Sequence, residues 1–156
     1  DRFVLHTGEL ADTRFLENLR MEASPVQLVM ANPPWRLVGS GRLPATEARR
    51  KALFGDKGTF PLFVSAASSL LEEDGRFACI ISPDRLQDML AALDGAGLTP
   101  YLLQYIHKQK TSPATFVLIE ARKGAHAKPS VAEPIALYGP ERFFTLESLA
   151  FCPFLR

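Results

Sequence analysis

The chain has 156 residues, of which 47% are hydrophobic and 22% are charged, and its formal net charge is +1. This length suits a single domain, and the near balance of charge excludes a molecule-wide basic field, so any nucleic-acid surface must be local. The cysteines and histidines lack the spacing of a metal site or a disulfide framework. No apolar run approaches the roughly 20 residues of a membrane span, and no signal peptide is visible. We therefore expect a cytoplasmic protein without a metal and without a membrane segment.

The first part of the chain predicts a short strand followed by a helix. Residues 2–6 are apolar enough for a strand, and residues 7–10 form a turn that carries Glu9. Residues 12–21 show apolar positions at helical spacing, and Asp12 is placed to cap the first turn. We expect a strand, a turn and a helix in this order.

The most informative stretch is residues 26–35, where a short apolar run ends in Asn32, Pro33, Pro34 and Trp35. A run this short and this apolar is typical of a central strand buried on both faces. The prolines donate no backbone hydrogen bond and hold the residues before them in extended conformations. The result is a stiff corner with free carbonyl oxygens, the Asn32 amide and the Trp35 ring. Such a set suits a planar amine, for example on a nucleobase or an amide.

A long polar segment, residues 36–58, follows the corner. Up to position 51 its only acid is Glu47, against the basic residues Arg36, Arg42, Arg49, Arg50 and Lys51. Residues 47–54 are predicted to form a helical turn. Long loops of this kind are usually functional or mobile. We interpret the segment either as a flap that contacts phosphates over a substrate base or as a solvated basic loop.

The central part of the chain alternates between helices and strands. The expected elements are residues 60–71 (helix), 76–82 (strand), 85–93 (helix), and 100–107 and 114–121 (strands). A short basic tip with Lys108 and Lys110 joins the last two strands, which predicts an antiparallel pair at the sheet edge. The alternation predicts an α/β doubly wound sheet, in which ligands bind beyond the carboxyl ends of the strands.

The composition turns to Lys, Ala, Pro and Ser at residues 123–133, as in a linker. A strand at residues 135–138 and a short terminal helix are expected after it. We divide the chain into a main domain, residues 1–124, and an extension, residues 125–156, that packs on it. The aromatic residues expected to make this contact are Tyr138, Phe143, Phe144, Phe151 and Phe154.

The corner at residues 32–35, with the sequence Asn-Pro-Pro-Trp, resembles the Asn-Pro-Pro-aromatic motif of S-adenosylmethionine-dependent amino methyltransferases. These enzymes act on adenine N6, cytosine N4 or glutamine N5. Residues 74–81 look like the next strand of that family after its glycine turn. Residues 122–124 look like the end of the last strand in bacterial valine-tRNA adenine-N6 methyltransferases. The resemblance therefore extends over most of the chain.

This resemblance implies the C-terminal part of a Rossmann-like class I methyltransferase sheet, with an antiparallel edge strand and residues 1–124 as a partial catalytic domain. It implies that S-adenosylmethionine is the cofactor. Glu9 matches by position the acidic residue that holds the cofactor's adenine amino group, with Glu in place of the usual Asp; a solvated turn carboxylate is the alternative. The residues implied to be catalytic are Asn32, Pro33, Pro34 and Trp35.

The glycine-rich turn that cradles the cofactor in this family is missing from the sequence. Neither Gly39-Ser40-Gly41 nor Gly95-Ala96-Gly97 opens a helix directly after a strand. By resemblance, the motif would precede position 1, and the chain would be the C-terminal part of a longer protein. We expect this piece alone to expose a sheet edge and to bind the cofactor weakly.

In the implied reaction, the Asn32 side-chain oxygen and the Pro33 carbonyl accept hydrogen bonds from the target amine, while Trp35 stacks on its ring. Adenine N6 in tRNA is the expected target. The alternatives are glutamine N5 of a release factor and a catalytically inert RNA-binding module. The sequence departs from the tRNA subgroup at residues 112–115, where more basic residues are expected. The side chains expected to contact the substrate are Arg36, Arg49, Arg50, Lys51, Lys108 and Lys110.

Overall fold

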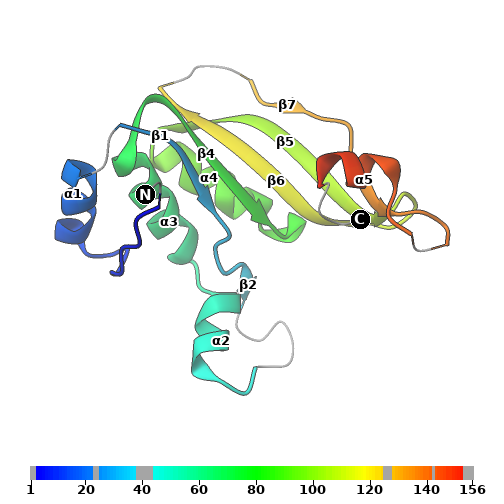
Figure 1. Ribbon diagram of the computed structural model, residues 1–156, viewed down its shortest axis with the longest axis horizontal. Coiled ribbons are helices and arrows are strands. Elements are labelled where there is room, and N and C mark those ends of the chain that lie inside the picture. Colours follow the sequence, from blue (N-terminus) through cyan, green and yellow to red (C-terminus); the bar gives the residue numbers. More distant parts are fainter. Residues whose placement is uncertain (1–2, 23–24, 38–43, 125–127, 142, 153–156) are drawn as a thin grey trace.

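The computed structural model describes residues 3–22, 25–37, 44–124, 128–141 and 143–152 (Figure 1). Its elements are α1 (Thr13–Glu22), β1 (Val26–Ala31), β2 (Arg36–Leu37), α2 (Glu47–Leu53), β3 (Phe54–Gly55), α3 (Thr59–Leu70), β4 (Leu71–Ile81), the 3-10 helix η1 (Pro83–Arg85), α4 (Leu86–Gly95), β5 (Leu98–Gln109), β6 (Ala114–Lys123), β7 (Ser130–Val131), β8 (Ile135–Tyr138) and α5 (Leu146–Phe151).

Within the described residues, the main sheet has six strands in the order β1-β4-β6-β5-β7, and β8 also pairs with β5. β1 and β4 are parallel, and β6 is antiparallel to both β4 and β5. β5 therefore runs in the same direction as β1 and β4, and the three strands end at one edge of the sheet. The expected α/β fold class is confirmed.

The antiparallel strand lies inside the sheet, whereas the sequence predicted it at the edge. β6 is inserted between β4 and β5. Its side chains Val117, Ile119 and Ala121 are buried, and such an apolar strand gains most from neighbours on both sides. The hairpin turn between β5 and β6 is residues 110–113, so Lys110 lies in the turn while Lys108, expected in the same tip, lies at the end of β5.

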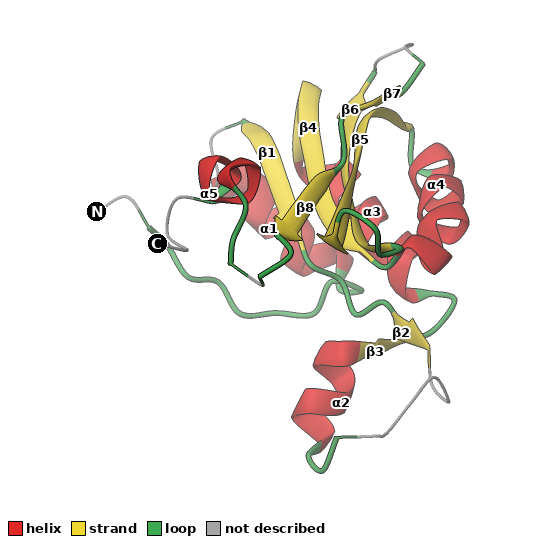
Figure 2. Ribbon diagram, turned by 90° about the vertical axis from the view of Figure 1, so that its right-hand side faces the viewer, coloured by secondary structure: helices red, strands yellow, loops and turns green. Residues whose placement is uncertain are grey.

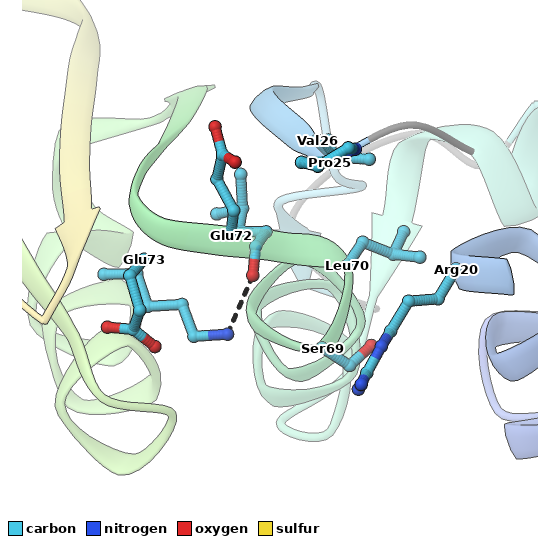
Figure 3. Close-up of a pocket in the computed structure, with 9 residues that line it drawn as sticks. Arg20, Pro25, Val26, Ser69, Leu70, Glu72 and Glu73 are labelled. Carbon is cyan, nitrogen blue, oxygen red and sulfur yellow. Dashed lines mark hydrogen bonds between the residues drawn. The ribbon is translucent and has the colours of Figure 1, made fainter.

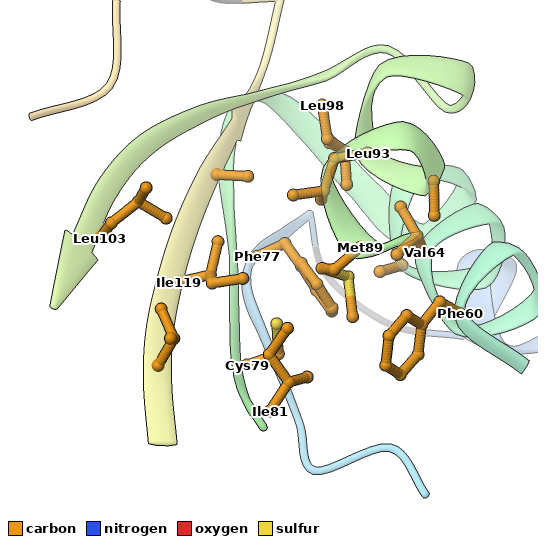
Figure 4. Close-up of a cluster of buried hydrophobic side chains, with 14 of the residues drawn as sticks. Phe60, Val64, Phe77, Cys79, Ile81, Met89, Leu93, Leu98, Leu103 and Ile119 are labelled. Carbon is orange, nitrogen blue, oxygen red and sulfur yellow. The ribbon is translucent and has the colours of Figure 1, made fainter. Parts of the chain in front are cut away.

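The hydrophobic core lies between one face of the sheet and the helices α3 and α4 (Figure 4). Alternate residues of β4, namely Phe77, Cys79 and Ile81, point into it, as the two-residue period of a strand requires. Phe60 from α3 and Leu93 from α4 close it from the other side. Figure 2 shows α5 on the opposite side of the strands from α4.

The strand expected at residues 2–6 is wrong. The described residues 3–9 form no helix or strand, and the side chains of Phe3 and Leu5 are 80% and 79% exposed. A strand needs a partner for its backbone groups, and no described strand borders this segment. The helix that follows is confirmed, since the backbone N–H groups of Arg14 and Phe15 both donate to Asp12 Oδ1.

β1 is the edge strand of the described sheet, because it pairs only with β4. Leu28 is 43% and Met30 76% exposed, so the expected burial on both faces is wrong for this strand. The prediction that the chain exposes a sheet edge agrees with the position of β1 at the end of the described sheet.

The turn expected before the next strand is present as an irregularity within β4. Val26 pairs with Leu71 and Leu28 with Arg76, so residues 72–75 bulge out of the ladder. Asp74 takes a positive φ of 63°, which a bulge of this kind accommodates.

The C-terminal part is joined to the sheet through β7 and β8, which both pair in parallel with β5. The Tyr138 ring stacks on Phe144 with centroids 5.0 Å apart. Phe143 and Phe151 remain exposed, against the expectation that they pack on the body. Phe154 lies outside the described residues.

Candidate active site at the carboxyl edge of the sheet

The corner, residues 32–35, directly follows β1 at the edge where the parallel strands end. The Asn32 side chain is exposed, whereas Pro33 is fully buried. Among the described residues, neither the Asn32 amide nor the Pro33 carbonyl has a hydrogen-bond partner. The buried Pro33 thus anchors the backbone, and the Asn32 side chain beside it is exposed. The catalytic role expected for these residues stays a prediction.

Trp35 is half-buried, and its ring has two neighbours. Phe116 of β6 meets it edge-on, with centroids 6.1 Å apart and planes at 74°. The Arg36 guanidinium lies over the ring, 5.3 Å from its centroid. The planar cation therefore occupies a position in which a flat ligand would stack. A base that stacks on this face of Trp35 must displace Arg36.

Arg85 holds the corner from inside the molecule. Its side chain is only 3% exposed, and its Nη1 donates to the Trp35 carbonyl oxygen at 2.8 Å. The sequence did not predict a role for this residue, because an arginine at the start of a helix is usually solvated. The available signal was its place just after β4, the strand next to β1, which brings it to the same edge.

The segment after the corner folds back on itself. β2 pairs in parallel with β3, so that Arg36 lies opposite Phe54 and Leu37 opposite Gly55. Between them lies α2, with Thr46 Oγ1 accepting from the Arg49 backbone N–H. Figures 1 and 2 show this unit projecting from the edge of the main sheet.

The basic residues predicted to bind substrate are distributed around this edge. Arg36 adjoins the corner, and Lys51 lines a cleft of about 550 Å³ together with Pro34 and Leu62. Lys51 also pairs with Glu47 at 3.4 Å. Arg49 and Arg50 are exposed on α2, and no described contact links them to the corner. Arg42 lies outside the described residues.

Lys108 and Lys110 lie at the end of β5 and in the turn that follows, at the same edge as the corner. Both are exposed. The turn is ordered by His107 Nδ1 and the Ser112 carbonyl oxygen, 2.7 Å apart, and by the Ser112 hydroxyl, which accepts from the Gln109 N–H.

Glu9 is not joined to the corner by any described contact. Its side chain is exposed, and its carbonyl oxygen accepts from the Asp12 N–H. The cofactor role expected for Glu9 stays a prediction.

Two further cavities differ in what they adjoin. One, of about 590 Å³, lies on the sheet face opposite α3 and α4 and is bordered by Asn32, Ile80, Leu118 and Phe151. The other, of about 350 Å³, lies at the opposite edge beside Arg20 (Figure 3). There Lys123 of β6 has a structural role, because its Nζ donates to the carbonyl oxygens of Ser68 and Leu71. Of these two cavities, only the one of about 590 Å³ is bordered by a residue of the corner.

The described part of the chain contains no cluster of three His, Cys, Asp or Glu side chains able to hold a metal ion. None of the helices in that part is long and apolar enough to cross a membrane. Burial raises the pKa of the Cys79 thiol from 9.0 to about 12, so this cysteine is a protonated core side chain.

No protein-family model and no curated protein matches the chain. Among solved structures, a predicted O-methyltransferase from Agrobacterium tumefaciens matches 62% of the chain with a TM-score of 0.54 and 23% identity. A putative DNA modification methylase from Thermus thermophilus matches 74% of it, with a TM-score of 0.45 and 17% identity. A putative class I S-adenosylmethionine-dependent methyltransferase from Listeria monocytogenes matches 78% of the chain, with a TM-score of 0.46 and 16% identity.

The chain spans only 44%, 55% and 40% of these three structures, respectively. The fold assignment rests on the first of them, which has the highest TM-score of the three. Together with the strand order, this similarity shows that the chain has a Rossmann-like α/β fold.

Proposed function

We propose that the chain carries the acceptor-binding side of an S-adenosylmethionine-dependent N-methyltransferase that acts on an exocyclic amine, adenine N6 in tRNA. One observation carries the proposal. The Asn32 amide is exposed at the carboxyl edge of the sheet without a hydrogen-bond partner among the described residues, on a backbone anchored by the buried Pro33. Ligands of open α/β sheets bind at this edge.

The corner offers what a weakly nucleophilic amine needs. The exocyclic nitrogen of adenine shares its lone pair with the ring. Hydrogen bonds from its N–H groups to Asn32 Oδ1 and the Pro33 carbonyl oxygen draw it toward tetrahedral geometry and stabilise the positive charge that develops on it. No described His or Cys lies at the corner to act as a base, and none is required, because the charged nitrogen can lose its proton to water.

The fit to the cofactor is partial. S-adenosylmethionine, when bound, supplies an electrophilic methyl group. The cavity of about 590 Å³ reaches Asn32 and offers room beside its side chain. The sequence contains no glycine-rich turn that opens a helix directly after a strand, so the residues that would cradle the cofactor are not among those at the corner. The chain's own contribution is to bind and orient the amine.

The charge around the site favours nucleic acid over protein. Arg36, Lys51, Lys108 and Lys110 lie along the same edge as the corner, and each could contact a phosphate. An unpaired loop base suits such a site, because it leaves its stack at a cost of a few kcal/mol.

The substrate is tested with the full-length native protein and cofactor labelled in its methyl group. Bulk tRNA, duplex DNA and a release factor are offered separately. We expect label in tRNA, on adenine N6. Label only in the release factor would instead assign glutamine N5, and no label in any substrate would favour an inert binding module.

The role of Asn32 is tested by Asn32→Ala in the same protein. Loss of one preorganised acceptor is expected to lower kcat by about 10²–10³-fold, without a loss of folding. The control is Gln27→Ala, which removes an exposed amide from β1, away from the corner. Equal activity of Asn32→Ala and Gln27→Ala would contradict the proposed role.

A further inference from the structure

The buried arginine Arg85 connects three elements around the corner. Its Nε donates to Asp88 Oδ2 at 2.6 Å within the η1–α4 segment, and its Nη1 donates to the Trp35 carbonyl oxygen at 2.8 Å. Its guanidinium also lies over the Phe60 ring of α3, 4.5 Å from the centroid. Each of these contacts comes from a different part of the chain.

A guanidinium that is 3% exposed is costly unless it is paired and hydrogen-bonded. Asp88 supplies the counter-charge, and the Trp35 carbonyl supplies the second acceptor. The corner in turn needs an external donor, because its two prolines have no N–H and cannot join a ladder. The buried Arg85 guanidinium and the Trp35 carbonyl oxygen therefore supply each other's hydrogen-bond partner.

The geometry of arginine makes this contact directional. The guanidinium is planar and its donors point in fixed directions. Asp88 fixes the Nε side and Phe60 fixes the plane, so Nη1 can meet the Trp35 carbonyl in only one place. From Trp35 the stiff prolines transmit that position back to Asn32.

We infer that Arg85 is a positioning residue for methyl transfer: it holds the Trp35 carbonyl and thereby sets where the Asn32 amide meets the target amine. This inference rests on the proposed function. Asp88 serves a second purpose, because it neutralises a cation that would otherwise oppose the positive charge developing on the amine.

The test compares Arg85→Met and Arg85→Lys in the full-length protein with tRNA as substrate. Met keeps the apolar stem over Phe60 but has no donor. We expect Arg85→Met to lower kcat by about 10²-fold with little change in the KM for the cofactor, since a small displacement of reacting groups has this effect. Lys keeps the charge but lacks the rigid fork, so it should restore only part of the rate.

Two controls separate positioning from general effects. Arg122→Met removes an arginine that also lies over an aromatic ring, that of Tyr101 at 4.1 Å, and beside Glu120 at 4.0 Å, but is more exposed and lies at the opposite edge of the sheet. Leu93→Ala weakens the core beneath α4 without touching the corner. Both controls are expected to keep the wild-type kcat at a temperature where the proteins are folded.

A second readout does not depend on turnover. Trp35 is the only tryptophan of the chain, and its emission is isolated by subtracting the spectrum of the same variant that also carries Trp35→Phe. We expect Arg85→Met to shift this emission to longer wavelength, because the ring loses its fixed, half-buried position. Arg122→Met and Leu93→Ala should leave it unchanged.

The outcomes are distinct. Wild-type kcat and emission in Arg85→Met would overturn the inference, and so would an equal loss of kcat in Leu93→Ala. Full recovery in Arg85→Lys would overturn the role of the rigid fork. If the wild-type protein methylates no substrate, the proposed function fails, and the Trp35 emission alone decides whether Arg85 positions the corner.

Discussion

At the scale of single residues, Gly55 shows how closely the corner is packed from outside. A Cβ at this position would lie 2.4 Å from the Pro34 carbonyl oxygen and 2.7 Å from Thr59 Oγ1. One neighbour is backbone and cannot rotate away. Thr59 Oγ1 in turn accepts from the Asp56 N–H, which ties the start of α3 to the same place. Gly55 thus lets β3 approach the corner.

Gly55→Ala should therefore displace the corner. We expect a loss of about 1–3 kcal/mol in the free energy of unfolding, as for other overpacked sites, together with a lower kcat. Urea denaturation and a methyl-transfer assay measure the two effects. Gly95→Ala is the matched control, because a Cβ there meets no atom within 4 Å. An unchanged free energy of unfolding in Gly55→Ala would show that β3 is not in tight contact with Pro34.

The chemistry of the candidate site was predictable from sequence to the extent that it resides in one peptide. Asn32, Pro33, Pro34 and Trp35 are contiguous, so their residue types alone indicate a stiff corner with acceptors and a ring. The contacts of Arg85 and Phe116 with Trp35 were not predictable, because they depend on which strands become neighbours. Long-range contacts of this kind leave no local pattern.

At the scale of elements, the hairpin between β5 and β6 brings two exposed lysines, Lys108 and Lys110, to the edge that carries the corner. This placement follows from the direction of β5, which is parallel to β1. A phosphate backbone that lies along this edge would pass both side chains. The hairpin is therefore the element most suited to test electrostatic binding of tRNA.

A double variant, Lys108→Ala with Lys110→Ala, should raise the KM for tRNA and leave kcat at saturating tRNA unchanged. The dependence of tRNA affinity on salt should weaken by about one unit of log–log slope for each phosphate that the protein no longer neutralises. Filter binding at several salt concentrations measures this slope. Lys128→Ala removes an exposed lysine beyond the far end of β6 and serves as the control. Equal slopes in all three proteins would exclude the hairpin from the interface.

Element prediction succeeded where periodicity and tertiary packing agree. α3, α4, β5 and β6 bury one side against the core, and their apolar spacing shows this. It failed at residues 3–5, where an apolar run is present but no described strand lies beside it. The same limit explains β1, whose composition suits a buried strand although Met30 is exposed.

At the scale of the whole molecule, the stability should depend on pH through the buried thiol of Cys79. Burial raises its pKa from 9.0 to about 12 in the folded state. Between these values the unfolded chain releases the thiol proton and the folded chain keeps it. The free energy of unfolding should therefore be unaffected by this group below pH 9 and should fall as the pH rises from 9 toward 12.

The measurement is urea denaturation at several pH values across this range, with Cys79→Ala for comparison. The variant is less stable because it leaves a small cavity, but its stability should fall less steeply with pH. Identical slopes for the two proteins would show that the thiol ionises equally in both states.

The whole sheet combines a part that the sequence predicts and a part that it does not. The alternation of helices and strands predicts an α/β fold, and the similarity to a methyltransferase structure agrees with it. The insertion of β6 between β4 and β5 was not predictable, because either side of β5 gives the same hydrophobic pattern. Which strands become neighbours depends on how all of the strands pack together in the sheet, and the pattern within one strand does not show it.

The pairing of β2 with β3 has a consequence for how such a protein can diversify. Arg36 and Leu37 lie beside Phe54 and Gly55, so the strand that follows α2 and the strand that leaves the corner meet at one place. Because the β2–β3 pair fixes this place, we expect the charge of α2 to be variable while Asn32 keeps its position. Under the proposed function, exchanging the surface of α2 would then be a route to a new substrate preference at an unchanged corner.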